Sequence, residues 1–229
     1  MKSLLKFPLL VAVATMMTCS FSACSDNDDP TPDTGTSETD AKFEAIAKQY
    51  LDHTVYVTYK NLADETEQLV KDLQALKSSK TDANVKATCE TFLEARAWWE
   101  KSEAFLYGAA TDFGIDPHID SWPLDLDGLQ TALKNTEQVE AMGGEDGDIY
   151  AGEKLGNSLL GFHGIEYILF EDGSPKSVSK ISDLHLTYAV AVAGDLRNRC
   201  WQLELSWRGE SAVNADRVAK VANELELPY

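Results

Sequence analysis

Residues 41–78 carry the longest helical pattern in the chain: AKFEAIAKQYLDHTVYVTYKNLADETEQLVKDLQALKS. Apolar or small residues recur there mostly at spacings of three and four, and neither glycine nor proline interrupts the pattern. This periodicity predicts one long amphipathic helix, or two helices with a bend between them. The positions that carry the pattern are Phe43, Ile46, Ala47, Tyr50, Leu51, Thr54, Val55, Thr58, Leu62, Leu69, Leu73 and Leu76.

Helical patterns continue on the C-terminal side of this stretch. Capping residues and glycines predict further helices at about 81–107, 127–142, 152–170, 177–207 and 213–225, with Thr81 or Asp82 and Asp127 as N-caps. No segment shows sustained period-two alternation, which argues against strands. We therefore expect an all-α fold, an up-and-down antiparallel bundle of about five to six helices.

The charge of the chain limits its partners. The 229 residues include 38 acidic and 20 basic side chains, which gives a net charge of −18 and a pI near 4.5. Nucleic-acid binding needs clustered lysine and arginine, so no nucleic-acid partner is expected. The charge permits metal cations, basic partners or simply a well-solvated surface.

The N-terminus resembles an export signal. Lys2 and Lys6 flank the start of an apolar stretch, residues 4–17, that is too short to span a bilayer. The sequence before Cys24 resembles a bacterial lipobox, so residues 1–23 are predicted to be a lipoprotein signal peptide with lipid attached to Cys24. The alternative is an ordinary secreted protein in which this cysteine is incidental.

The segment after Cys24 is predicted to be a tether. Residues 24–40 are acidic and rich in proline and threonine, and they resemble the tethers of Bacteroidetes-type lipoproteins. The predicted helical domain then covers residues 41–229. The lipid would anchor the protein to the outer membrane or cell surface, with the periplasmic face as an alternative. Without residues 1–23 the charge becomes −20 on 206 residues, because that segment holds two lysines and no acid.

Two cysteines remain in the helical part, Cys89 and Cys200. Both fall inside predicted helices. The envelope permits a disulfide, but nothing in the sequence brings the two residues together. We expect buried small residues first and a bridge second.

Two charged residues interrupt the apolar stripe of the second predicted helix. Cys89, Phe92, Trp99 and Leu106 form that stripe, and Arg96 and Glu103 take the intervening inward positions. Buried charges are costly unless they are paired or liganded. Either this face is wide enough for both side chains to reach solvent, or each pairs with another helix, or they belong to a site.

The fourth predicted helix holds a histidine and a glutamate three residues apart, His163 and Glu166. Residues at this spacing lie about 5–6 Å apart at Cβ, so both can reach one metal. Glu166 is predicted to face inward, because it completes an apolar stripe formed by Leu155, Leu159, Phe162 and Leu169. Gly161 and Gly164 flank the histidine, although glycine costs about 0.5–1 kcal/mol in a helix interior. Close approach of another helix, or space beside the histidine, would explain them.

A single histidine and glutamate three residues apart are common in proteins, so a structural role for His163 and Glu166 stays open. His185 is a further candidate ligand, and His53 and His118 are more often structural or exposed than liganding. A metal ion needs three or more donors, and the sequence does not say which of these converge.

Three motifs resemble those of the imelysin-like family, also classed as M75 peptidases. Residues 161–166 (GFHGIE) resemble its Gly-x-His-x-x-Glu motif. Residues 96–108 (RAWWEKSEAFLYG) resemble its Arg/Trp/Ser-Glu-Ala-Phe helix, and residues 116–125 (DPHIDSWPLD) resemble its Asp-Pro-x-Ile-Asp-x-Trp-Pro loop. The three occur in the family's order.

The resemblance implies an all-α envelope protein, often a lipoprotein, associated with iron or haem acquisition. It implies that His163 and Glu166 are metal ligands, for iron or zinc, and that a partner protein takes part in uptake. It also implies that five further residues lie near the same cleft: Arg96, Glu103, Asp120, Trp122 and Asp125.

The chain departs from the family in length. Family members are usually longer, with two bundle halves and the proposed site between them. This chain is therefore expected to be a short or truncated member, and whether Tyr229 is the natural end stays open.

Three functions are considered: a binding protein for metal or haem, an M75-type metallopeptidase, and a surface interaction module. The peptidase is disfavoured because the established zinc-peptidase helix carries His-Glu-x-x-His, whereas this helix has one histidine; no catalytic residue is assigned.

Overall fold

The structure is a computed structural model that describes residues 37–229. The predicted signal peptide, Cys24 and most of the predicted tether lie outside these residues. Helix α1 (Glu38–Tyr50) begins within the last residues assigned to the tether, and it buries none of its own residues. Residues 42–229 form one compact unit.

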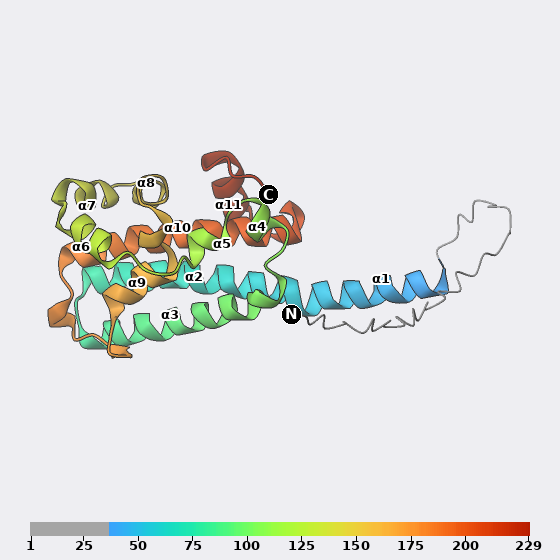
Figure 1. Ribbon diagram of the computed structural model, residues 1–229, viewed down its shortest axis with the longest axis horizontal. Helices are drawn as coiled ribbons and strands as arrows, with labels where there is room; N and C mark the ends of the chain where they lie inside the picture. The colour runs from blue at the N-terminus through green and yellow to red at the C-terminus, as the bar shows by residue number, and fades with distance from the viewer. Residues whose placement is uncertain (1–36) are drawn as a thin grey trace, which may run out of the picture. The chain divides into compact units, whose positions relative to one another are not determined.

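Three long helices form the centre of this unit: α2 (Tyr56–Ser78), α3 (Asp82–Ser102) and α10 (Asp183–Arg208). Helix α2 packs against both of the others (Figure 1). A short turn makes α3 antiparallel to α2. Helix α10 is also antiparallel to α2, because Asp183 at its start pairs with Lys80 and Trp207 near its end stacks on Tyr59.

Shorter elements connect and cover the long helices. Helices α7, α8 and α9 lie against α10, and α9 also contacts α3. The elements are α4 (Ala109–Asp112), α5 (Asp116–Ile119), α6 (Leu126–Lys134), α7 (Thr136–Met142), α8 (Gly147–Lys154), α9 (Gly161–Leu169), α11 (Ala215–Val218), β1 (Phe170–Glu171), β2 (Ser174–Pro175), four 3-10 turns (Glu103–Phe105, Asn157–Leu159, Val178–Lys180 and Glu210–Ala212) and two π-helical turns (Leu51–Val55 and Ala219–Glu224).

Side-chain caps explain where several helices begin. The Thr81 hydroxyl accepts from the backbone N–H of Asn84 and starts α3, as predicted. Ser182 and His185 form a reciprocal capping box at the start of α10. Asp125 caps α6, two residues before the predicted Asp127, and Asn135 caps α7.

The all-α prediction is confirmed, but the count of five to six helices is wrong: residues 37–229 contain eleven α-helices. Asn135 divides the predicted helix 127–142 into two. Non-helical backbone at Leu155–Leu160, with one 3-10 turn, divides the predicted helix 152–170. A two-residue hairpin, in which Phe170 pairs with Pro175, also departs from the expectation of no strands.

The core is rich in aromatic side chains. The largest fully buried side chains include Trp99, Tyr59, Tyr188, Phe105 and Phe162. The two cysteines are buried and not bridged. Burial raises the pKa of the Cys89 thiol to about 12, so both behave as small apolar residues rather than reactive thiols. Within residues 37–229, no helix combines the length and apolar character needed to cross a bilayer.

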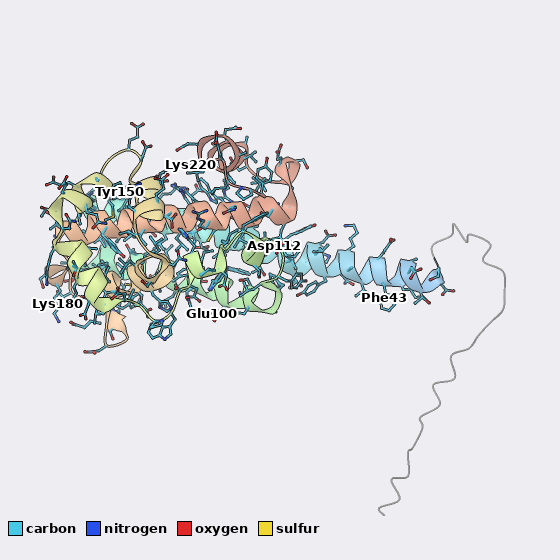
Figure 2. All side chains as sticks on the ribbon, turned by 45° about the horizontal axis from the view of Figure 1, so that its top comes forward. Phe43, Glu100, Asp112, Tyr150, Lys180 and Lys220 are labelled. Atoms are coloured by element: carbon cyan, nitrogen blue, oxygen red, sulfur yellow. The ribbon has the colours of Figure 1, made fainter. Side chains whose placement is uncertain are left out.

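A buried arginine ties the C-terminal segment to the bundle. Arg217 of α11 contacts Glu204 of α10 at 2.7 Å, and it contacts Asp64 and Glu67 of α2 at 2.6 and 2.8 Å. The side chain of Glu204 is only 2% exposed. Lys220 of the following turn is labelled in Figure 2. Its Nζ lies 3.2 Å from Oδ2 of Asp148 in α8. These ion pairs hold α11 and the last turn against α2, α8 and α10.

We expect Arg217→Ala to lower the free energy of unfolding by about 2–3 kcal/mol, because it leaves the buried Glu204 with Arg208 as its remaining cation. The matched control is Lys60→Ala, which removes an exposed ion pair to the same Asp64 and should cost less than about 0.5 kcal/mol. Urea unfolding followed by circular dichroism measures both. Equal losses in the two variants would contradict the buried role of Arg217.

Candidate functional site

Gly161 brings the start of α9 against the end of α5. Its φ of +65° is a conformation that side chains other than glycine rarely adopt. A Cβ atom placed there would lie 1.9 Å from the carbonyl oxygen of Ile119. At Gly164, a Cβ would lie 2.9 Å from the Tyr188 hydroxyl of α10. The glycines therefore permit close approach, as the sequence suggested, and they bring His163 beside Asp120.

Asp120 is the junction of this region. Its Oδ2 accepts a hydrogen bond from the Trp99 indole at 2.8 Å, and its Oδ1 accepts one from the guanidinium of Arg96. Burial alone would raise the pKa of Asp120, but the bonds from Arg96 and Trp99 outweigh it and hold that pKa below its ordinary value. Arg96 also pairs with Glu100, at the surface of α3, at 2.6 Å (Figure 2). Asp120 is therefore ionised and fixed in place.

His163 lies between two carboxylates. Its Nε2 is 3.0 Å from Oδ1 of Asp120, and its Nδ1 is 3.1 Å from Oε2 of Glu166. The side chain of His163 is 16% exposed, whereas that of Glu166 is 52% exposed. One nitrogen thus faces a fixed interior carboxylate, and the other faces a carboxylate that reaches solvent.

The solvent side of His163 opens into a groove of about 460 Å³. Its walls are aromatic and aliphatic, and its rim carries three carboxylates. The Trp122 ring lies 4.8 Å from the His163 ring, and Phe92 lies 5.3 Å from Phe170, centroid to centroid. The groove is lined by Phe92, Leu93, Trp122, Leu124, His163, Glu166, Tyr167, Phe170, Glu171, Asp172 and Gly173.

Five predicted site residues come together here: Arg96, Asp120, Trp122, His163 and Glu166. Arg96 pairs with another segment, which was one of the alternatives left open. The i, i+3 spacing of His163 and Glu166 does bring the two side chains together.

Two residues predicted to lie near the cleft, Asp125 and Glu103, do not join this group. Asp125 accepts a hydrogen bond from the Gly128 N–H and caps α6. Glu103 is exposed, so its predicted inward position is wrong, because α3 ends at Ser102 and a 3-10 turn changes the helical phase. Glu166 is likewise exposed rather than part of a buried stripe, since Leu155 and Leu159 precede α9.

The other histidines have structural positions. His118 is 2.6 Å from the buried Asp195, and His185 caps α10. Burial, with the nearby Lys176 and Lys80, lowers the pKa of His185. His53 is exposed in the π-helical turn before α2. His163 is the one histidine that lines the groove.

Sequence reasoning missed Trp99 as the partner of Asp120, and it missed the wall supplied by the β1–β2 hairpin. Trp99 was assigned to the core stripe, and its position there is correct, but its indole N–H also needs an acceptor when buried. The hairpin had a signal in Asp172-Gly173, a turn dipeptide that lies between the two strands.

The donor set around His163 suits a metal ion but is small. Metal-binding histidines commonly donate the second ring N–H to a carboxylate, and Asp120 is placed to accept it from Nε2. Nδ1 of His163 and the carboxylate of Glu166 would then be the available donors. No group of three or more histidine, cysteine or acidic side chains in residues 37–229 could share one ion. Asp120 and Glu166 do not combine because they lie at opposite nitrogens of the ring.

Comparison with known proteins places this geometry in a family. Residues 55–226 match the imelysin family, peptidase M75. The chain belongs to the imelysin family. This confirms the resemblance drawn from the three motifs, and all three lie inside the matched range.

Two relatives of this imelysin-family chain are named for iron. The chain is 31% identical over 169 residues to the iron-regulated protein A of Synechococcus elongatus (strain ATCC 33912 / PCC 7942 / FACHB-805), covering 73% of this chain and 41% of the relative. The crystal structure of an iron-regulated protein A precursor from Parabacteroides distasonis ATCC 8503 superposes with a TM-score of 0.65 at 28% identity, covering 79% of this chain and 50% of the other. The chain therefore spans half or less of the length of these relatives.

We expect Gly161→Ala to lower the free energy of unfolding by about 2–4 kcal/mol, since it adds backbone strain and a clash with Ile119. Gly156→Ala is the control, because its φ of −75° is ordinary and nothing lies within 4 Å of the added Cβ. It should change stability by less than about 0.5 kcal/mol. Urea unfolding of the two variants tests this, and equal stability would show that α9 and α5 do not approach this closely.

Asp120→Asn should destabilise the metal-free protein at neutral pH by about 1–3 kcal/mol, because it weakens the bonds from Arg96 and Trp99. The folded-state pKa of Asp120 lies below its ordinary 3.8, so this contribution is full above that pH and is lost as pH falls through the folded pKa. The difference in unfolding free energy between wild type and Asp120→Asn should therefore be full at pH 7 and become smaller as the pH falls below 3.8 towards 2.5.

Glu140→Gln on the exposed side of α7 controls for general loss of a surface charge and should show a small difference from wild type throughout. If the difference in unfolding free energy between wild type and Asp120→Asn is the same at pH 7 and at pH 2.5, the ionised state assigned to Asp120 is contradicted.

Proposed function

We propose that this protein is an envelope protein of iron acquisition that binds a metal ion, iron foremost, through His163 and Glu166. One observation carries the proposal: Nδ1 of His163 faces Oε2 of Glu166 at 3.1 Å on the groove side, while Nε2 faces the fixed Asp120 at 3.0 Å. The ion is the cargo of the protein. His163 and Glu166 hold it, and Asp120 orients the imidazole.

The separation of the two donors supports a shared ion. Imidazole nitrogen and carboxylate oxygen bind zinc at about 2.0–2.2 Å, so two adjacent ligands of one ion lie about 3 Å apart. The observed 3.1 Å fits that spacing. A nitrogen and oxygen donor set suits iron or zinc.

Haem is the alternative form of the cargo, and the aromatic groove favours an organic ligand. The porphyrin occupies four positions around the iron and leaves only the two opposite axial ones. His163 and Glu166 are too close together to take opposite positions on one ion. A haem would therefore use His163 alone, and the pair of residues favours an ion with adjacent open positions.

Two other functions have less support. An M75-type metallopeptidase needs a metal with an open position and a separate general base, but here Glu166 is used as a ligand. A surface interaction module would need no metal at all. The names of the two relatives favour iron, and Cys24, if lipidated, would hold the protein at the membrane for transfer to an uptake partner.

The test is calorimetric titration of the purified metal-free chain with Fe²⁺ under anaerobic conditions and with Zn²⁺. We expect one ion per chain, and a loss of affinity of at least about tenfold in both His163→Ala and Glu166→Gln.

His53→Ala is the control because it removes an exposed histidine outside the groove, and it should bind as wild type does. Absence of binding, or binding unchanged in both site variants, would reject the metal site and leave the interaction module. Metal-dependent cleavage of a peptide library that is lost in Glu166→Gln would instead support the peptidase.

A further inference from the structure

We infer that the metal enters this site already bound to a flat aromatic chelator, positively charged or neutral as a complex, and that the chelator occupies the groove beside His163. This rests on the proposed metal site and specifies the form of its cargo. The observation behind it is a juxtaposition: two side-chain ligands stand next to an aromatic groove of about 460 Å³.

The first step is the number of ligands. Iron and zinc take four to six ligands, and the described part of the chain offers two at this point, His163 and Glu166. Asp120 cannot be a third, because it faces the other ring nitrogen and already accepts from Arg96 and Trp99. The remaining positions are open to water or to a ligand that arrives with the ion.

The second step is the surface next to the open positions. Small-molecule sites are typically concave, largely apolar and about 300–1,000 Å³ in volume, and this groove falls in that range. Two of its apolar side chains are largely uncovered: Trp122 is 72% exposed and Leu93 is 55% exposed. The Trp122 ring lies 4.8 Å from the His163 ring and is tilted by 56° to it, so a flat ring bound beside His163 would be within reach of the exposed indole.

The third step is charge. The groove is lined by the carboxylates of Glu166, Glu171 and Asp172 and by no lysine or arginine. Lys180 pairs with Glu171, which leaves two acidic groups beside the ligand positions. An anionic carboxylate chelate would be repelled here, whereas a complex that keeps the positive charge of its metal would be attracted.

The test compares three probes that present the same ion: Zn²⁺ alone, the 1:1 complex of Zn²⁺ with 1,10-phenanthroline, and the complex of Zn²⁺ with nitrilotriacetate. Both complexes leave adjacent positions open on zinc, but the first is flat, aromatic and cationic, and the second is aliphatic and anionic. Calorimetry on the full chain should show the phenanthroline complex binding about tenfold more tightly than Zn²⁺ alone. The nitrilotriacetate complex should bind more than about tenfold more weakly than the phenanthroline complex.

Variants identify the residues that cause the preference for the phenanthroline complex over Zn²⁺ alone. In Trp122→Ala, the ratio of affinities for the phenanthroline complex and for Zn²⁺ alone should fall towards one. The control is Trp98→Ala, which removes a half-buried tryptophan of α3 that contacts Lys101 and does not line the groove; its ratio should equal that of wild type. Asp172→Asn should reduce the preference for the cationic over the anionic complex.

Failure of this inference differs from failure of the metal site. If Zn²⁺ binds through His163 but phenanthroline gives no gain, or the gain survives Trp122→Ala, then the aromatic chelator is wrong and the metal site stands. If His163→Ala changes the binding of neither Zn²⁺ nor its complexes, the metal site itself is wrong. Phenanthroline that binds equally well without zinc would also overturn the inference, since the groove would then act independently of the ion.

Discussion

The fixed carboxylate of Asp120 is the interaction on which the rest of the site depends. It follows α5 directly, yet Arg96 and Trp99 of α3 hold it, so two segments distant in sequence are joined by one charged group. Burying that charge is costly, and the arginine and the indole offset the cost. Because Gly161 allows α9 to contact the same loop, the ring of His163 lies beside this carboxylate, which Arg96 and Trp99 hold in place.

The two carboxylates around His163 differ in their exposure and in their partners. Asp120 is only 13% exposed and is fixed by two donors, so it can hold the imidazole in one orientation. Glu166 is half-exposed on the surface of α9 and pairs with the histidine alone among the described residues. Asp120 can therefore orient the imidazole from the interior, while Glu166 faces the solvent side of the same ring. The two carboxylates lie on different elements, Asp120 after α5 and Glu166 on α9.

Residue patterns over a few positions predicted much of the fold and of the candidate site. The main wrong predictions came from following one helical phase past the end of a helix. The helical class, the Thr81 cap and the pairing of His163 with Glu166 depend on residues a few positions apart, where periodicity is reliable. Glu103 and Glu166 were placed inward by stripes drawn across a helix end, and a change of helix type shifted both to the surface. The bond from Trp99 to Asp120 was not predictable because a buried indole can find its acceptor on any neighbouring segment.

The openness of the site bears on what it does with an ion. Structural zinc sites are closed by four protein ligands and hold their metal as part of the fold. Here the proposed pair lies at a groove, apart from the buried aromatic core and the Arg217 ion pairs. An ion bound by two side chains at such a groove would stay accessible to solvent and to other ligands. That accessibility would suit the proposed capture and release of an ion, and the ligand that completes the coordination sphere would then determine which complexes are captured.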